Sequence, residues 1–181
     1  MYYCYFYIPT LFNSTIMTDN RWTTFKLTAS FDTGVRNIYE AWATPAGLES
    51  WFLRRAEFFS IVKRQREPHE FISKEDTYSW YWHGYDDDTV EYGQVLENNG
   101  ADLIKFTFSG GSIVTVDIQN KYGLTLIELT QENIPIEDDP AKNLYVQCQI
   151  GWTFYLANLK SIIEGGKDLR NKRVDLFTSF K

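Results

Sequence analysis

Residues 140–166 read PAKNLYVQCQIGWTFYLANLKSIIEGG, a long stretch with helical periodicity near the end of the chain. Its apolar side chains recur every three or four positions and form one stripe, made of Cys148, Trp152, Leu156, Leu159 and Ile163. The pair Gly165-Gly166 is a standard C-terminal stop signal. The spacing therefore predicts a long helix from near Pro140 to Glu164 that has one apolar face to bury.

The sequence ahead of this helix alternates between apolar and polar residues, as half-buried strands do. The alternation predicts strands over residues 22–31, 54–62, 76–84, 89–97, 101–109, 112–120 and 124–131. Several of these stretches are separated by tight-turn residues such as Asn99-Gly100. A run of strands joined by tight turns predicts an antiparallel meander, which must cover its apolar face with another element.

Two short helices are expected between the first two strands. Val35, Ile38, Tyr39 and Trp42 have helical spacing, and we expect Asp32 or Thr33 to cap that helix. Thr44-Pro45 then predicts the start of a second helix, with the threonine as N-cap. The elements together predict an α+β domain in which a sheet packs on the long C-terminal helix.

Five segments carry a resemblance to a known family: YEAWATPAGLESWF (39–52), DTYSWYWHG (76–84), EYGQVLE (91–97), FTF (106–108) and GWTFYLANLKSIIEGGKDLR (151–170). They are similar to the family named for the C-terminal domain of the activator of the 90-kDa heat-shock protein ATPase, within the START-like or SRPBCC superfamily. The resemblance implies a helix-grip fold, in which a curved antiparallel sheet surrounds the long helix and leaves a deep cavity. Glu75 departs from the family, whose members often carry glycine there.

We divide the chain into three parts. Residues 18–170 are expected to form the START-like domain, and residues 171–181 a C-terminal tail. Residues 1–17 are an uncertain N-terminal extension, because they contain neither lysine nor arginine and Pro9 interrupts their apolar run. They match neither a secretory signal nor a membrane span.

The charge and the cysteine count narrow the function classes. A formal charge of −6 argues against a nucleic-acid partner, and the short basic runs at residues 63–66 and 170–173 are expected to be solvated surface. Only Cys4 and Cys148 are present, which is typical of a reducing compartment such as the cytoplasm. His69 and His83 lack the spacing of a zinc site, so we expect no metal and no cofactor.

The candidate site is an aromatic wall facing the long helix across the interior. Its members are expected to line a cavity for an apolar small molecule or lipid: Tyr78, Trp80, Trp82, Phe106, Phe108, Trp152 and Leu156. The alternative is that these rings simply fill the core.

Binding is expected rather than catalysis. No Gly-x-Ser-x-Gly nucleophile elbow is present, and Cys148 lies among apolar residues, where the pKa of a thiol rises and its reactivity falls. A polyketide cyclase-like or hydrolase-like enzyme is the alternative if polar groups point inward, with Glu91, Tyr92, Glu128 and Arg54 as candidates. The resemblance also leaves open an accessory protein that binds a chaperone. The oligomeric state is not assigned.

Overall fold

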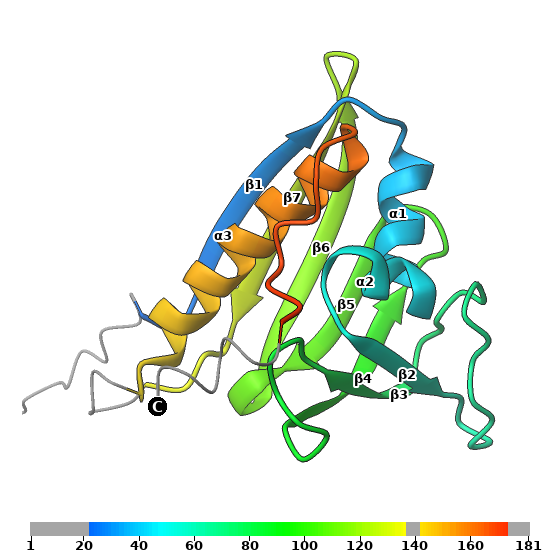
Figure 1. The fold of residues 1–181 in the computed structure, drawn as a ribbon, viewed down its shortest axis with the longest axis vertical. Helices are drawn as coiled ribbons and strands as arrows, with labels where there is room; N and C mark the ends of the chain where they lie inside the picture. Colours follow the sequence, from blue (N-terminus) through cyan, green and yellow to red (C-terminus); the bar gives the residue numbers. More distant parts are fainter. Residues whose placement is uncertain (1–21, 137–141, 174–181) are drawn as a thin grey trace, which may run out of the picture.

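The computed structural model describes residues 22–136 and 142–173 and contains one seven-stranded antiparallel sheet (Figure 1). The strand order is β1-β7-β6-β5-β4-β3-β2, so the first strand pairs with the last. The strands are β1 (Phe25–Phe31), β2 (Arg55–Phe59), β3 (Thr77–Tyr81), β4 (Val90–Asn98), β5 (Leu103–Phe108), β6 (Ser112–Lys121) and β7 (Leu124–Glu132). The helices are α1 (Val35–Ala43), α2 (Pro45–Trp51), α3 (Leu144–Ile163) and the 3-10 turn η2 (Ser109–Gly111).

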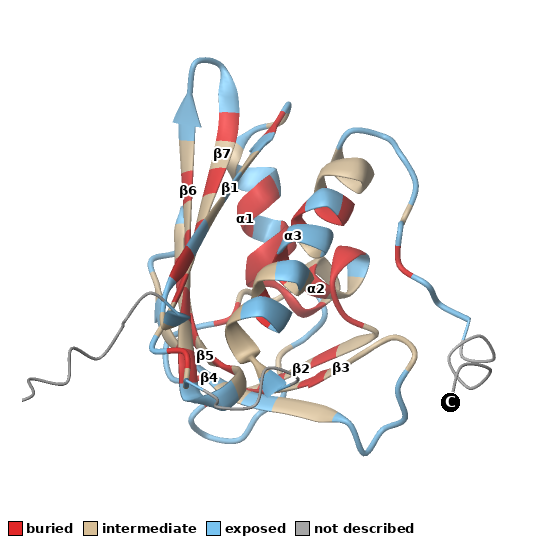
Figure 2. Cartoon of the chain, turned by 90° about the vertical axis from the view of Figure 1, so that its left-hand side faces the viewer, coloured by how far each residue is buried: buried red, intermediate tan, exposed pale blue. Residues whose placement is uncertain are grey.

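The alternation in the sequence produces a sheet with one buried face. In β6 the side chains of Ser112, Val114, Val116 and Ile118 are buried, whereas the residues between them are half-buried. Val116 lies opposite Leu129 of β7, so apolar side chains meet across strands on the inner face. Figure 2 shows all three α-helices on this same face. The fold is therefore α+β and of the helix-grip type, as predicted.

The long helix α3 lies along the inner face beside β1 (Figure 1). It begins at Leu144, where the side chain of Asn143 caps it by accepting a hydrogen bond from the backbone of Val146 at 3.1 Å. The predicted start near Pro140 lies outside the described residues. It ends at Ile163, and Gly165 follows with a φ of 80°, the left-handed conformation expected of a glycine stop.

The two short helices follow β1 as predicted, but only one cap is where the sequence predicted it. Thr44 caps α2 by accepting a hydrogen bond from the backbone of Gly47 at 3.0 Å. The predicted cap of α1 by Asp32 or Thr33 is wrong, since Gly34 holds the N-cap position without a side-chain bond. The Thr33 hydroxyl instead accepts a hydrogen bond from the Asn37 side chain at 2.8 Å.

The second basic run contains a buried arginine, so the expectation of solvated surface is wrong for Arg170. Its guanidinium donates to the backbone carbonyls of Glu49 and Leu53 at 2.9 Å each, and to that of Ser50 at 2.7 Å. It also pairs with Asp168 at 2.6 Å. The planar donor fork thus binds carbonyls that the end of α2 leaves without helical partners.

The first basic run departs from the expectation in the same way. The Arg66 side chain is 14% exposed and binds both carboxylate oxygens of Asp76, at 2.8 and 2.9 Å. Lys63 and Arg64 of the same run are exposed, as expected. In each run, one arginine is withdrawn from solvent by fixed acceptors: Arg170 is buried and Arg66 is half-buried.

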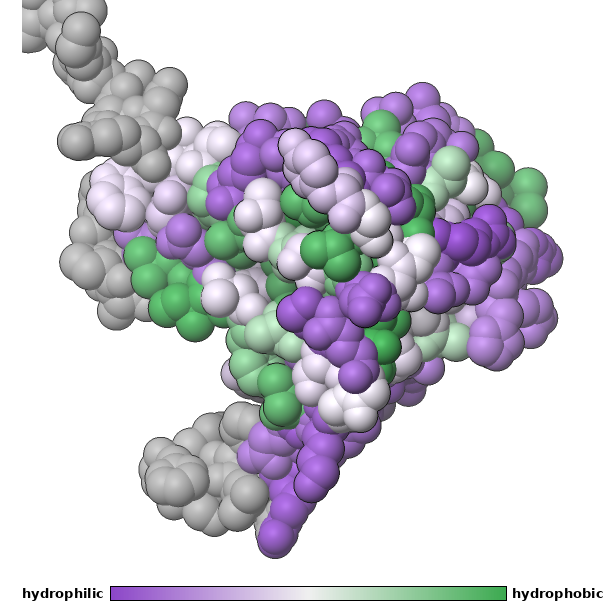
Figure 3. All heavy atoms as spheres, turned by 90° about the horizontal axis from the view of Figure 1, so that it is seen from above, coloured by the Kyte–Doolittle hydropathy of each residue, from purple (hydrophilic) through white to green (hydrophobic). Residues whose placement is uncertain are grey.

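Within residues 22–136 and 142–173, no helix combines the length and the apolar character needed to cross a membrane. No group of three or more potential metal-ligating side chains occurs within the same two ranges. Seen from above, the hydrophobic side chains lie in separate groups among hydrophilic ones (Figure 3). The predicted N-terminal extension, residues 1–17, lies outside the described residues, and so does most of the predicted C-terminal tail, residues 174–181.

Candidate functional site

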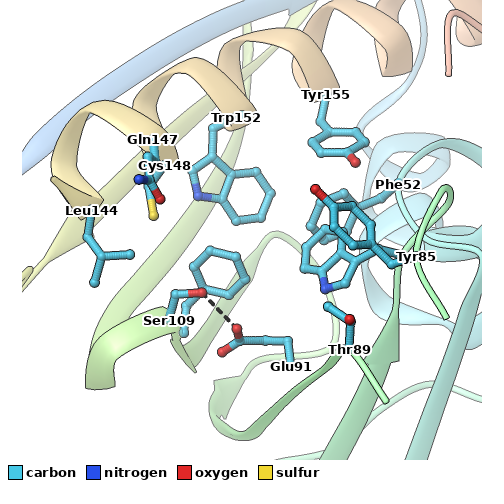
Figure 4. A pocket seen from close by; sticks show the side chains of 13 residues that line it. Phe52, Tyr85, Thr89, Glu91, Ser109, Leu144, Gln147, Cys148, Trp152 and Tyr155 are labelled. Atoms are coloured by element: carbon cyan, nitrogen blue, oxygen red, sulfur yellow. Dashed lines mark hydrogen bonds between the residues drawn. The ribbon is translucent and has the colours of Figure 1, made fainter. Parts of the chain in front are cut away.

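A cavity of about 420 Å³ lies between the first half of α3 and the sheet, near the start of β4. Figure 4 shows Cys148, Trp152 and Tyr155 on α3, with Ser109 and Glu91 on the opposite wall and Phe52 and Tyr85 at one side. Its lining is Phe52, Trp82, Tyr85, Thr89, Glu91, Phe108, Ser109, Leu144, Gln147, Cys148, Gly151, Trp152 and Tyr155. Six of these thirteen residues are aromatic, and four others have polar or charged side chains: Thr89, Glu91, Ser109 and Gln147.

The rings of the wall contact one another and form a continuous surface. Phe52, which follows α2, lies 4.7 Å from Tyr155, 5.0 Å from Trp152 and 5.2 Å from Trp82 between ring centroids. Trp152 lies 5.2 Å from Phe108 on the far side. These spacings match favourable aromatic pairing, so the rings hold one another in place.

A chain of buried hydrogen bonds fixes the ring of Trp152. Its indole Nε1 donates to Oε1 of Gln131 at 2.9 Å, and Nε2 of Gln131 donates to Oγ of Ser112 at 2.8 Å. The Ser112 hydroxyl donates in turn to the carbonyl of Ser109 at 2.9 Å. Gln131 and Ser112 are fully buried. One network therefore orients both the indole on α3 and the turn that carries Ser109.

Glu91 is the acidic side chain of the pocket wall. It lies on β4 and accepts a hydrogen bond from the Ser109 hydroxyl at 2.7 Å (Figure 4). Burial raises the pKa of Glu91 above its usual value, and the Ser109 bond opposes part of that shift. Tyr92, the next residue along the strand, is 71% exposed on the opposite face. Strand alternation is thus what turns Glu91 inward.

Two groups that α3 contributes to the pocket stay neutral. Burial raises the pKa of the Cys148 thiol, and a hydrogen bond with Gln131 offsets this only in part. Burial also raises the pKa of the Tyr155 phenol. Cys148 is therefore a thiol at neutral pH, which makes it a poor nucleophile.

The predicted aromatic wall separates into two groups. Trp82, Phe108 and Trp152 line the cavity. The other four predicted residues are buried and lie outside the lining: Tyr78, Trp80, Phe106 and Leu156. Tyr78 and Trp80 stack at 4.0 Å between centroids, and Trp80 lies 5.3 Å from Phe106. These rings pack in the core behind the pocket.

The other polar candidates lie away from the cavity. Glu128 forms a surface ion pair with Lys26 at 2.7 Å. Arg54 forms an ion pair with Asp87, and its Nε donates to the carbonyl of Trp82 at 3.2 Å. Neither residue belongs to the lining, and nor do His69 and His83. Burial lowers the pKa of His83, so that imidazole is neutral at neutral pH.

Ten of the thirteen lining residues were absent from the predicted site, among them Phe52, Tyr85, Ser109 and Tyr155. Tyr155 follows Trp152 by three positions, which is the spacing of neighbours on one helix face. That spacing was a usable signal. Tyr85 and Ser109 lie in segments between strands, where periodicity gives no direction for a side chain.

The comparisons with known proteins agree with this geometry at the level of the fold. A protein from Staphylococcus saprophyticus has a TM-score of 0.63 at 17% identity, over 81% of this chain and 96% of that one. The Aha1 dimer from Colwellia psychrerythraea has a TM-score of 0.61 at 15% identity, over 80% and 98%. An HSP90 activator from Plasmodium falciparum has a TM-score of 0.56 at 18% identity, over 79% and 96%.

No curated protein sequence matches this chain significantly. The family model that matches is described as Activator of Hsp90 ATPase homolog 1-like protein, and it spans residues 32–164. This range contains α1, α2, every strand after β1, and α3. The chain therefore belongs to the family of Activator of Hsp90 ATPase homolog 1-like proteins.

Proposed function

We propose that the protein binds an apolar small molecule or lipid in the pocket between α3 and the sheet. The observation that carries this proposal is the cavity of about 420 Å³ with its wall of contacting aromatic rings. Cavities of a few hundred cubic ångströms with apolar walls and few polar groups are typical of sites for small organic ligands. Glu91 and Ser109 provide the polar contact that would orient such a ligand.

Binding without catalysis is our leading proposal. The lining contains one thiol, that of Cys148, and burial holds it in its weakly nucleophilic form. The lining residues include no histidine. Glu91 favours the alternative of a cyclase-like or hydrolase-like enzyme, because a carboxyl group of raised pKa in a pocket is suited to general acid-base work.

A chaperone partner is a separate candidate, which family membership supports. Its test is a pull-down with an Hsp90-type chaperone together with the ATPase rate of that chaperone.

For the compartment we propose the cytoplasm, because Cys148 is a buried free thiol and a reducing environment keeps it so.

Native mass spectrometry of the purified protein, before and after organic extraction, tests the binding proposal. We expect a bound species that extraction removes, and a rise in melting temperature when members of a lipid and polyketide panel are added back. The absence of any bound species, together with no thermal shift across the panel, would contradict the proposal. Turnover of a panel member that is lost in Glu91→Gln would favour the enzyme instead.

A further inference from the structure

We propose that the ligand of this pocket is an amphipathic organic cation, whose ammonium group pairs with the carboxylate of Glu91 while its apolar part lies against the rings. The inference rests on the proposed binding function and names the chemical class of its ligand. It follows from the charges, the hydrogen bonds and the rings of the lining taken together.

The charge carried by the described lining of the pocket is of one sign, negative. Among the described residues of the lining, Glu91 is the acidic one, and none is a lysine, arginine or histidine. The other titratable groups around Glu91 are the phenols of Tyr85 and Tyr155, the thiol of Cys148, and Tyr78 of β3. Burial raises the pKa values of Tyr78, Cys148 and Tyr155, so these three groups are neutral at neutral pH. An anionic ligand would therefore face a like charge without a counter-ion, whereas a cation would be paired.

The carboxyl group of Glu91 is partly buried and lines the pocket. Its Oε2 accepts the hydrogen bond from Ser109. Burial raises the pKa of this group, because the charged form loses solvation. An ammonium group in the cavity would pair with the carboxylate and offset that loss. A neutral apolar ligand would not.

The aromatic wall favours the same class of ligand. Six rings line the cavity: Phe52, Trp82, Tyr85, Phe108, Trp152 and Tyr155. The faces of such rings carry negative electrostatic potential and attract a desolvated cation within about 6 Å. Phe52, Trp82 and Tyr155 contact one another on one side of the pocket. A pocket with a carboxylate on one wall and a cluster of aromatic rings on another suits a protonated amine better than it suits an anion.

Three probes that share one skeleton test the inference by isothermal titration calorimetry: phenylbutylamine, phenylbutanol and phenylbutyrate. At neutral pH they are a cation, a neutral molecule and an anion. We expect the amine to bind at least about tenfold more tightly than the alcohol, and the anion most weakly. Lowering the pH through the pKa of Glu91 should remove the amine's advantage, because the protonated carboxyl group no longer offers a charge.

Two variants locate the effect. Glu91→Gln should abolish the preference for the amine over the alcohol. Glu97→Gln removes the same charge from an exposed position on the same strand and should keep the preference. Equal affinity for amine and alcohol, tightest binding of the anion, or a preference that survives Glu91→Gln would overturn the inference and leave the binding function standing. Failure of all three probes to bind would overturn both.

Discussion

Asp168 and Glu91 are both half-buried carboxylates, but their surroundings are opposite. Asp168 lies beside the guanidinium of Arg170, which holds its pKa far below the usual range. Glu91 has one serine hydroxyl as its partner, and burial raises its pKa. The pair of Asp168 and Arg170 links the segment after α3 to the end of α2 through the Ser50 carbonyl. The carboxyl group of Glu91 instead lines the cavity. The difference separates a structural carboxylate from one that we propose binds a ligand.

The largest expected effect comes from breaking the structural side of this comparison. Arg170→Ala leaves the carbonyls of Glu49, Ser50 and Leu53 without their donor, and Asp168 without its counter-charge. Loss of one partner from such a buried network should lower the free energy of unfolding by about 3 kcal/mol. Urea denaturation measures this loss.

Arg170→Lys is the matched control, because it keeps the positive charge but loses the planar fork. We expect an intermediate loss of stability. If Arg170→Ala unfolds at the same urea concentration as the wild type, the described bonds of Arg170 do not stabilise the fold.

A smaller effect is expected from the buried network behind the pocket. Gln131→Leu removes the partners of the Trp152 indole and the Ser112 hydroxyl, both of which are buried. The Ser112 hydroxyl keeps its bond to the Ser109 carbonyl, but the buried indole N–H of Trp152 loses its acceptor, which should cost about 2 kcal/mol in the free energy of unfolding. Affinity for an apolar probe should also fall, because Trp152 loses the bond that orients its ring.

Thermal and urea denaturation measure the stability of Gln131→Leu, and calorimetry measures its affinity. Gln131→Glu is a useful comparison, since it keeps an acceptor for the indole but buries a carboxyl group. Unchanged stability and affinity in Gln131→Leu would show that ring packing alone positions Trp152.

The smallest stability effect, and one of opposite sign, is expected at Glu91. Its folded-state pKa lies above the unfolded value, so folding favours the protonated form. The stabilising contribution of that form is complete below the unfolded pKa of about 4.3 and is lost as the pH rises through the folded pKa. Glu91→Gln should therefore be as stable as the wild type or slightly more stable at neutral pH, with a difference below about 1 kcal/mol.

Asp168 supplies the contrast for this pH experiment. Its folded-state pKa is lowered, so its contribution is present above the unfolded pKa and is lost as the pH falls toward the folded one. Urea midpoints measured across acidic pH should separate Glu91→Gln from Asp168→Asn. A Glu91→Gln variant that is clearly less stable at neutral pH would show that the carboxylate is structural.

The sequence predicted the architecture because it rests on periodicity. The alternation in β6 and the stripe from Cys148 to Ile163 each require one buried face, and the structure has that face. The N-cap of α1 was not predictable in the same way. Asp32 and Thr33 are both good caps, and only the backbone path selects Gly34.

Only part of the pocket lining was predicted, because the sequence pattern does not show how far along the inner face of the sheet each ring lies. Alternation places Tyr78, Trp80 and Trp82 on one face but does not say how far each lies from the end of α3. Tyr78 and Trp80 lie within β3 and stack in the core, whereas Trp82 follows the last residue of the strand and lines the cavity. The burial of Arg170 was not predictable from its charged neighbours, because its acceptors are backbone carbonyls more than a hundred residues earlier.

The most direct test of pocket binding uses Gly151, a lining residue of α3 with open space where a side chain would project. Gly151→Phe should place a ring in the cavity, and Gly151→Ala controls for the gain in helix propensity of about 1 kcal/mol. Calorimetric titration with phenylbutanol should show wild-type affinity in Gly151→Ala and at least about a tenfold loss in Gly151→Phe. Equal affinity in all three proteins would contradict binding in this pocket.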